Sequence, residues 1–213
     1  ASCLVGSEMC IRDSSWGKYG MISAFGTSFT DYAAQAGTFA MGAGMWDNMV
    51  AYQTPTFAGF TAYAQYGMGN SKTNYGSVEN ESSSDRYYAL GATYANGPLN
   101  LYAAVDSINY ASWSNGTAAQ PGDVDDSLTV TIGGNFDFEV LKLFAGAQYF
   151  DEVKLSSLKG VVGGFEDSDY NAVDGFASKV KGWSLGLSAS IPAGTGTVLV
   201  GAAYVDAEAA DSQ

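Results

Sequence analysis

The chain has 213 residues, of which 46% are hydrophobic and 14% aromatic, and its formal net charge is -13. It contains no histidine, which excludes a Ser-His-Asp triad and any His-ligated metal site but leaves carboxylate-only catalysis open. The acidity argues against a nucleic-acid partner, because a phosphate backbone is bound through Lys and Arg. The chain also lacks an apolar run of about 20 residues, so no transmembrane helix is predicted.

The first fourteen residues, ASCLVGSEMCIRDS, differ in composition from the rest and hold both cysteines, Cys3 and Cys10. The stretch resembles the in-frame translation of a sequencing-library adapter, so we expect residues 1–14 to be non-native and take them out of the fold argument. A disordered native terminus and a disulfide that closes a six-residue loop are the alternatives. On the adapter interpretation, the true N-terminus is missing.

From Lys18 onward the chain divides into strand-like runs of about ten residues. We expect nine strands, at 18–26, 46–53, 57–67, 86–95, 99–108, 127–137, 141–150, 180–191 and 197–206. Short turns at 54–56, 96–98, 138–140 and 192–196 alternate with long connections at 27–45, 68–85, 109–126 and 151–179. Antiparallel hairpins with short turns at one end and long loops at the other are typical of bacterial outer-membrane barrels.

Side chains alternate along these runs with a period of two. In 127–138, Leu128, Val130 and Ile132 share one parity, while Thr129 and Thr131 share the other. This pattern predicts a sheet with one apolar and one polar face. The fold class that follows is all-β, an antiparallel up-and-down barrel wall.

Aromatic residues of the apolar parity gather at the two ends of the strands. They are Tyr66, Tyr88, Tyr149, Trp183 and Tyr204 at the long-loop end, and Tyr52, Tyr94, Phe136 and Phe138 at the short-turn end. Two aromatic rows around a small-aliphatic band are what two membrane–water interfaces select. The alternative, aromatics filling the ends of a soluble core, does not require tyrosine hydroxyls so regularly at the rims.

Residues 46–60 read WDNMVAYQTPTFAGF. This stretch resembles the signature of the general, non-specific porins of Gram-negative outer membranes, with matches at Asp47, Asn48, Tyr52, Thr54, Pro55, Phe57, Gly59 and Phe60. The resemblance implies a 16-stranded barrel, commonly a homotrimer, whose third extracellular loop folds inward. By position, 27–45 would be that constriction loop.

The chain departs from the family at the pore. Met45 and the pair Phe25-Gly26 stand where the family often has arginines, so a basic pore wall is not expected. A 16-stranded barrel needs about 340 residues. We therefore interpret residues 15–213 as part of a barrel, with strands missing at both ends.

Polar-parity residues are the candidates for contact with solutes in the lumen. They are Asp31 in the candidate constriction loop and, on strands or their ends, Asp47, Gln53, Thr61, Tyr63, Gln65, Asn100, Tyr102, Asp106, Thr131, Asn135, Asp137, Lys142 and Gln148. With Asp31, Asp47 and Asp106 toward the loop side and Lys142 toward the turn side, a weak cation preference is the hypothesis, and hydrated wall residues without a selective role are the alternative.

The predicted function is a water-filled channel in the outer membrane for passive diffusion of ions and small hydrophilic solutes, without catalytic residues, cofactor or metal. Expected partners are the lipid bilayer, lipopolysaccharide and two further copies of the chain. An outer-membrane adhesin and a substrate-specific channel are the alternatives, and a soluble β-rich binding module is a third.

Overall fold

The computed structural model describes residues 21–24, 49–68, 86–109, 126–154 and 179–209. In these ranges, no helix is long and apolar enough to cross a membrane. The predicted loop 27–45, the first fourteen residues, Asp31 and Asp47 lie outside the described residues.

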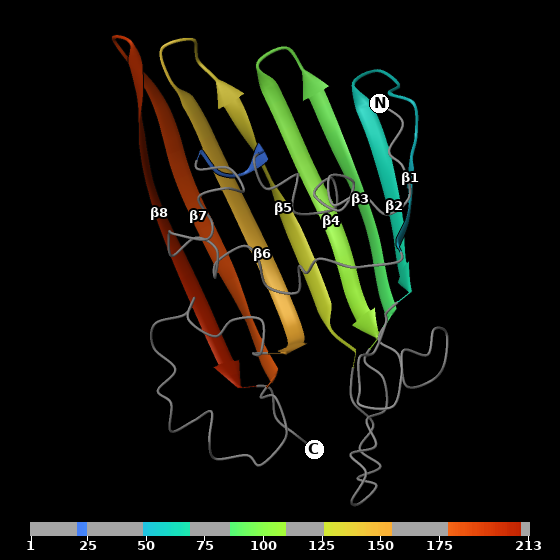
Figure 1. The fold of residues 1–213 in the computed structure, drawn as a ribbon. Coiled ribbons are helices and arrows are strands. Elements are labelled where there is room, and N and C mark those ends of the chain that lie inside the picture. The colour runs from blue at the N-terminus through green and yellow to red at the C-terminus, as the bar shows by residue number, and fades with distance from the viewer. Residues whose placement is uncertain (1–20, 25–48, 69–85, 110–125, 155–178, 210–213) are drawn as a thin grey trace, which may run out of the picture.

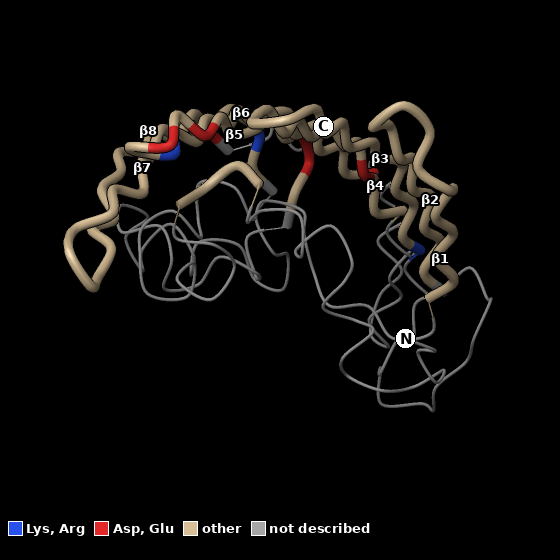
Figure 2. Tube along the Cα trace, turned by 90° about the horizontal axis from the view of Figure 1, so that it is seen from above, with Lys and Arg blue, Asp and Glu red and all other residues tan. Residues whose placement is uncertain are grey.

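Eight strands form one antiparallel sheet in which each strand pairs with the next along the chain (Figure 1). They are β1 (Met49–Gln53), β2 (Phe60–Met68), β3 (Arg86–Asn96), β4 (Leu99–Asn109), β5 (Leu128–Asp137), β6 (Lys142–Lys154), β7 (Lys179–Ala193) and β8 (Gly196–Ala209). The prediction of an all-β, up-and-down meander is confirmed. Seen from above, the strands follow an open arc (Figure 2).

The hairpins β1–β2, β3–β4, β5–β6 and β7–β8 all turn at the same end of the sheet (Figure 1). Their turns are short, whereas the connections 69–85, 110–127 and 155–178 leave from the opposite end. We call these the short-turn end and the long-loop end. The predicted alternation of connection lengths is therefore confirmed.

The first hairpin turns later than the sequence suggested. Pro55 pointed to a tight turn at 54–56, but the reversal lies at Ala58 and Gly59, whose φ angles are 50° and 83°. Phe57 and Phe60 close it with two backbone hydrogen bonds of 2.8 Å each. Positive φ at both central residues is the type I′ geometry that matches the twist of paired strands.

The close packing of Gly59 explains why glycine stands there. A Cβ at this position would overlap the carbonyl oxygen of Ala95, and the Ala95 N–H donates to the Gly59 carbonyl at 2.9 Å. The left-handed φ and the missing side chain are thus both used, and the turn is joined to β3 as well as to its own hairpin.

Other strand bounds also differ from the prediction, and three of these differences affect the arrangement of the sheet. The strand expected at 18–26 is not formed at residues 21–24, which are the part of it that the structure describes. β6 continues to Lys154, past a register shift between Phe150 and Val153. The last hairpin turns at 194–195 alone, because Pro192 pairs with Thr197 inside the ladder.

We predict that Gly59→Ala destabilises the folded protein more than Gly194→Ala. Gly194 also has a left-handed φ, 61°, but a Cβ there would meet nothing within 4 Å. Gly194→Ala should cost only the left-handed strain, about 1–2 kcal/mol, whereas Gly59→Ala adds a backbone overlap. The folded fraction on unheated detergent gels, followed through a urea titration, measures both. Equal midpoints for the two variants would show that the contact with Ala95 is unimportant.

Candidate functional site

The sheet has an inner, concave face that carries the polar parity and an outer, convex face that carries the apolar parity. On the inner face, six predicted lumen residues are buried, at 7% exposure or less: Thr61, Tyr102, Asp106, Thr131, Asn135 and Gln148. Tyr63, Gln65, Asn100 and Lys142 are half-buried, and Gln53 and Asp137 are exposed at strand ends. The structure brings these residues together on one face, as the alternation predicted.

Polar pairs cross the strands of the inner face. The Asn100 amide donates to Asn135 Oδ1 at 3.1 Å, and the Gln148 amide donates to Thr131 Oγ1 at 2.7 Å. Both pairs are direct register partners, in β4–β5 and β5–β6. Cross-strand polar pairs of this kind hold the side chains of a wall in fixed positions.

Residues 21–24 lie against this inner face. The Asn135 amide donates to the Met21 carbonyl at 2.9 Å, and the Ala24 N–H donates to Ser188 Oγ at 2.9 Å. Ile22 is 1% exposed and packs against Tyr102. Instead of extending the wall as a strand, this segment crosses the inner side of the sheet from β5 to β7.

The outer face exposes large apolar side chains along the middle of the strands. Leu90, Ile132 and Leu187 are 62%, 55% and 60% exposed, and Leu185 is 48% exposed. A protein folded around a core in water buries such residues, and contiguous apolar surface on this scale marks a membrane or protein interface.

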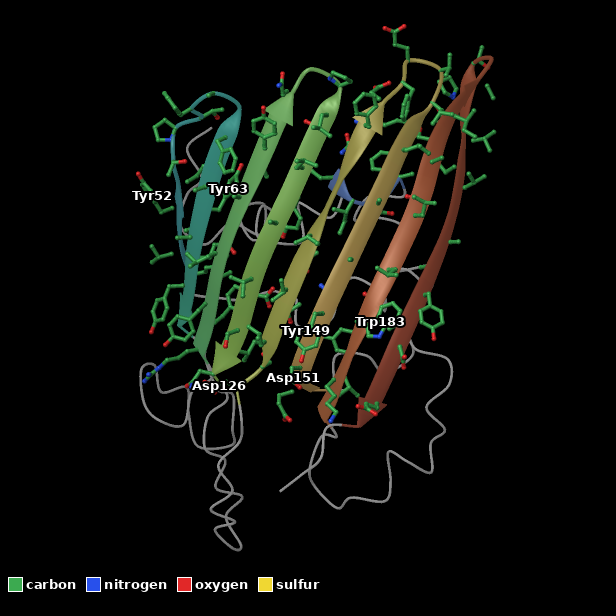
Figure 3. The ribbon with its side chains drawn as sticks, turned by 180° about the vertical axis from the view of Figure 1, so that it is seen from behind. Tyr52, Tyr63, Asp126, Tyr149, Asp151 and Trp183 are labelled. Carbon is green, nitrogen blue, oxygen red and sulfur yellow. The ribbon has the colours of Figure 1, made fainter. Side chains whose placement is uncertain are left out.

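Aromatic rings frame this apolar band at both ends. At the long-loop end, ring centroids are 5.2 Å apart for Tyr66–Tyr88 and 5.4 Å apart for Trp183–Tyr204. Tyr149 pairs in register with Trp183, and Figure 3 shows both at this end of the outer face. The rings follow the two-row arrangement predicted from the sequence.

The row at the short-turn end contains more aromatics than predicted. Phe136 and Phe138 lie with centroids 4.6 Å apart, and Tyr94 contacts Phe60 at 5.7 Å. Tyr52 is 64% exposed on the edge strand β1. Phe57 and Phe60, at 82% and 54% exposure, belong to the same row, and their position beside the hairpin turn was the signal that could have placed them.

Charged side chains lie beyond the aromatic row at the long-loop end. Lys181 Nζ is 3.5 Å from Glu208 Oε1, and the Asn109 amide donates to both oxygens of Asp126 at 2.8 and 2.9 Å. Figure 3 shows Asp126 and Asp151 at this rim, past Tyr149. The order along the strand is apolar, then aromatic, then charged, which is the order from hydrocarbon to water.

The inner face also contains buried residues that the sequence analysis did not single out. Tyr87, Phe144 and Phe150 are 2%, 7% and 0% exposed. Phe150 packs with Val153 and Val180 in an apolar cluster near the long-loop end. The inward position of Tyr87 could have been predicted, because it has the opposite parity to Tyr88. Val153 could not, because it follows the register shift in β6, which reverses the parity.

Within the described ranges no group of three or more Cys, Asp and Glu residues is arranged to hold a metal ion. The chemistry that this surface offers is that of a wall with amides, hydroxyls and phenols, plus the charged groups of Asp106 and Lys142, on one side and hydrocarbon-like side chains on the other.

Comparison with known proteins agrees with this division of faces. The family model described as Gram-negative porin matches residues 2–213. The chain is 32% identical over 197 residues to an outer membrane porin protein of Bordetella pertussis (strain Tohama I), a match that covers 81% of this chain and 46% of that protein. The chain therefore spans about half the length of this curated relative. No solved structure gives a significant match.

We predict that Leu187→Arg, in the middle of β7, destabilises the protein in lipid vesicles by about 2–4 kcal/mol, the cost of arginine at a bilayer midplane. An exposed leucine in water would tolerate the same change with little effect. Thr195→Arg, at the exposed turn, is the matched control and should cost about 0–1 kcal/mol. Reversible denaturant unfolding from vesicles measures the unfolding free energy of both variants. If Leu187→Arg lowers it no more than Thr195→Arg does, this face does not lie in hydrocarbon.

Proposed function

Because this chain belongs to the Gram-negative porins, a family of outer-membrane channels rather than enzymes, we propose that it builds part of a water-filled channel for passive diffusion of ions and small hydrophilic solutes. The protein is located in the outer membrane of a Gram-negative bacterium.

One observation carries the proposal: the sheet is apolar outside and polar inside. Leu185 and Leu187 point outward and are exposed, while their neighbours Ser184 and Ser188 face inward at 0% and 4% exposure. A wall of this kind places hydrocarbon on the side of the leucines and water on the side of the serines once it closes.

The lumen is narrowed, in this proposal, by the segment 27–45 that the family resemblance assigns to an inward-folded loop. That segment lies outside the described residues. Its support comes from residues 21–24 just before it, which are already held on the inner face through Asn135 and Ser188. Because residues 21–24 lie on the inner face, a segment that follows them can be proposed to enter the lumen directly.

The same proposal gives the channel a weak preference for cations. Asp31, Asp47 and Asp106 are the candidate acidic residues toward the long-loop end, and Lys142 is the candidate basic residue near the short turns. Lys142 lies over the ring of Phe144, with Nζ 5.5 Å from the centroid, which keeps its charge on the inner face. Rings or clusters of fixed charge favour ions of the opposite sign.

We predict that the full-length protein in a planar bilayer shows stepwise conductance and a reversal potential on the cation side in a KCl gradient. Lys142→Gln should raise the cation-to-anion permeability ratio by about twofold, because it removes a positive charge from the lumen. Lys181→Gln is the control, since this lysine is paired with Glu208 at the rim, and it should leave the ratio unchanged. Absence of conductance would overturn the channel, and anion preference would overturn the assigned selectivity.

We further propose that three copies associate and that the charged rim contacts lipopolysaccharide. The family resemblance supports the trimer. The rim residues Asp126, Asp151 and Glu208, beside Lys181, support contact with phosphates and their bridging divalent cations.

The mass of the protein extracted in mild detergent should equal three chains plus bound lipopolysaccharide. Release of the lipid by chelator, with the trimer intact, would indicate cation-bridged binding, and a monomer mass would contradict the assembly.

A further inference from the structure

Asp106 is a carboxylate buried on the inner face of β4 without a partner for one of its oxygens. Its side chain is 4% exposed, and Oδ2 has no hydrogen bond. Burial of an unpaired carboxylate is costly, so such a group is normally neutralised by a proton, a basic side chain or a metal ion.

Three basic side chains in the described part of the chain lie away from Asp106, although the Nε of one of them, Arg86, is buried without a hydrogen bond. Lys181 pairs with Glu208 on the outer rim, and Lys142 lies at the short-turn end over Phe144. Arg86 starts β3 at the opposite parity from Tyr87, which faces inward. Among the described residues, no ion pair includes Asp106.

The groups beside Asp106 offer oxygen atoms. The register aligns Gln65 of β2, Ala89 of β3, Asp106 of β4 and Thr129 of β5 in one row across the inner face. Gln65 Oε1 and Thr129 Oγ1 are themselves buried, and neither meets the full geometry of a hydrogen bond, although Thr129 lies beside the Asp106 carboxylate. Between Gln65 and Asp106 stands only the methyl group of Ala89, so a long amide side chain can reach over it toward the carboxylate.

We propose that the Asp106 carboxylate, the Thr129 hydroxyl and the Gln65 amide oxygen bind a hard, oxygen-seeking cation of the Ca²⁺ class in the inner wall. One negative and two neutral oxygens from three strands supply a partial coordination shell, which water completes, as is usual for ions of this class. The cation neutralises the carboxylate and satisfies the two lone oxygens at once. This site rests on the proposed channel only in that the lumen delivers the hydrated ion.

Two other arrangements account for the same atoms and give different results. Asp106 can be protonated and its O–H can donate a hydrogen bond to Thr129 Oγ1, in which case no metal binds. The Gln65 amide can also rotate so that its NH₂ faces the carboxylate, since oxygen and nitrogen of an amide are assigned from the surrounding hydrogen bonds.

Terbium luminescence tests the site in the full-length protein purified from outer membranes in detergent. Tb³⁺ takes the ligands of Ca²⁺ and emits when a nearby tyrosine is excited. Tyr102 lies on the same strand and face as Asp106, four residues earlier, and is 5% exposed. We expect saturable emission that Ca²⁺ displaces, and a loss of affinity of about tenfold or more in Asp106→Asn, because ligand charge sets the affinity.

Two variants separate this site from ions bound at acidic loops. Tyr102→Phe removes one of the inward-facing tyrosines near the site and should lower the emission without changing the competing Ca²⁺ affinity. Asp137→Asn removes an exposed carboxylate at the short-turn end and should leave the titration unchanged. The heat-modifiable gel shift shows whether each variant folds, and Thr129→Val replaces Asp106→Asn if the latter does not.

Emission from folded Asp106→Asn or Thr129→Val equal to that of the parent would overturn the site. So would an infrared band of a neutral carboxylic acid at neutral pH that Asp106→Asn removes, because it would show a proton in place of the cation. Terbium binding with the expected variant pattern in a protein without conductance would uphold the site and overturn only the channel.

Discussion

The rest of the structure depends on an unbroken backbone ladder. Register pairs run from Met49↔Gly67 in the first hairpin to Ala193↔Gly196 in the last, with one shift in β6. In hydrocarbon each unpaired N–H or C=O costs several kcal/mol, so a membrane sheet is held in register far more strongly than one in water. A slip of one strand by one residue would also turn the outward-facing leucines of that strand inward.

Because the register is fixed, the division between faces could be read from the sequence. Leu128 and Thr129 have opposite parity in the sequence. In the structure Leu128 lies on the outer face at 41% exposure, and Thr129 lies on the inner face at 0%. Period-two alternation is a local property, and a paired strand can express it in only one way. The aromatic rows followed for the same reason, since they sit at the ends of strands whose parity was already known.

The sequence analysis missed features in which the backbone conformation moves a turn or interrupts the inward–outward alternation of side chains. Pro55 suggested a turn, but the chain reverses where Ala58 and Gly59 both take positive φ, and alanine gives no sign of that. In β6 the register shift between Phe150 and Val153 inserts one extra residue relative to β7, and Glu152 in this bulge has a φ of 54°. Both Phe150 and Val153 then face inward, although three positions apart, and no strict alternation predicts this. The docking of Ile22 on Tyr102 depends on contacts across the sheet, which a sequence pattern does not contain.

The edges of the sheet explain why the proposed channel needs more than the eight described strands. β8 has fourteen residues, and in the described structure only its β7 side is paired. A strand of that length cannot keep its other row of N–H and C=O groups bare in hydrocarbon, so the membrane protein needs further pairing strands there and along the five-residue β1. The relative in Bordetella pertussis, of which this chain covers 46%, is long enough to supply them in a single polypeptide. Only when the ladder closes can the inner face, with Asn135 and Gln148 already positioned by their cross-strand bonds, line the proposed channel instead of forming one side of an open arc.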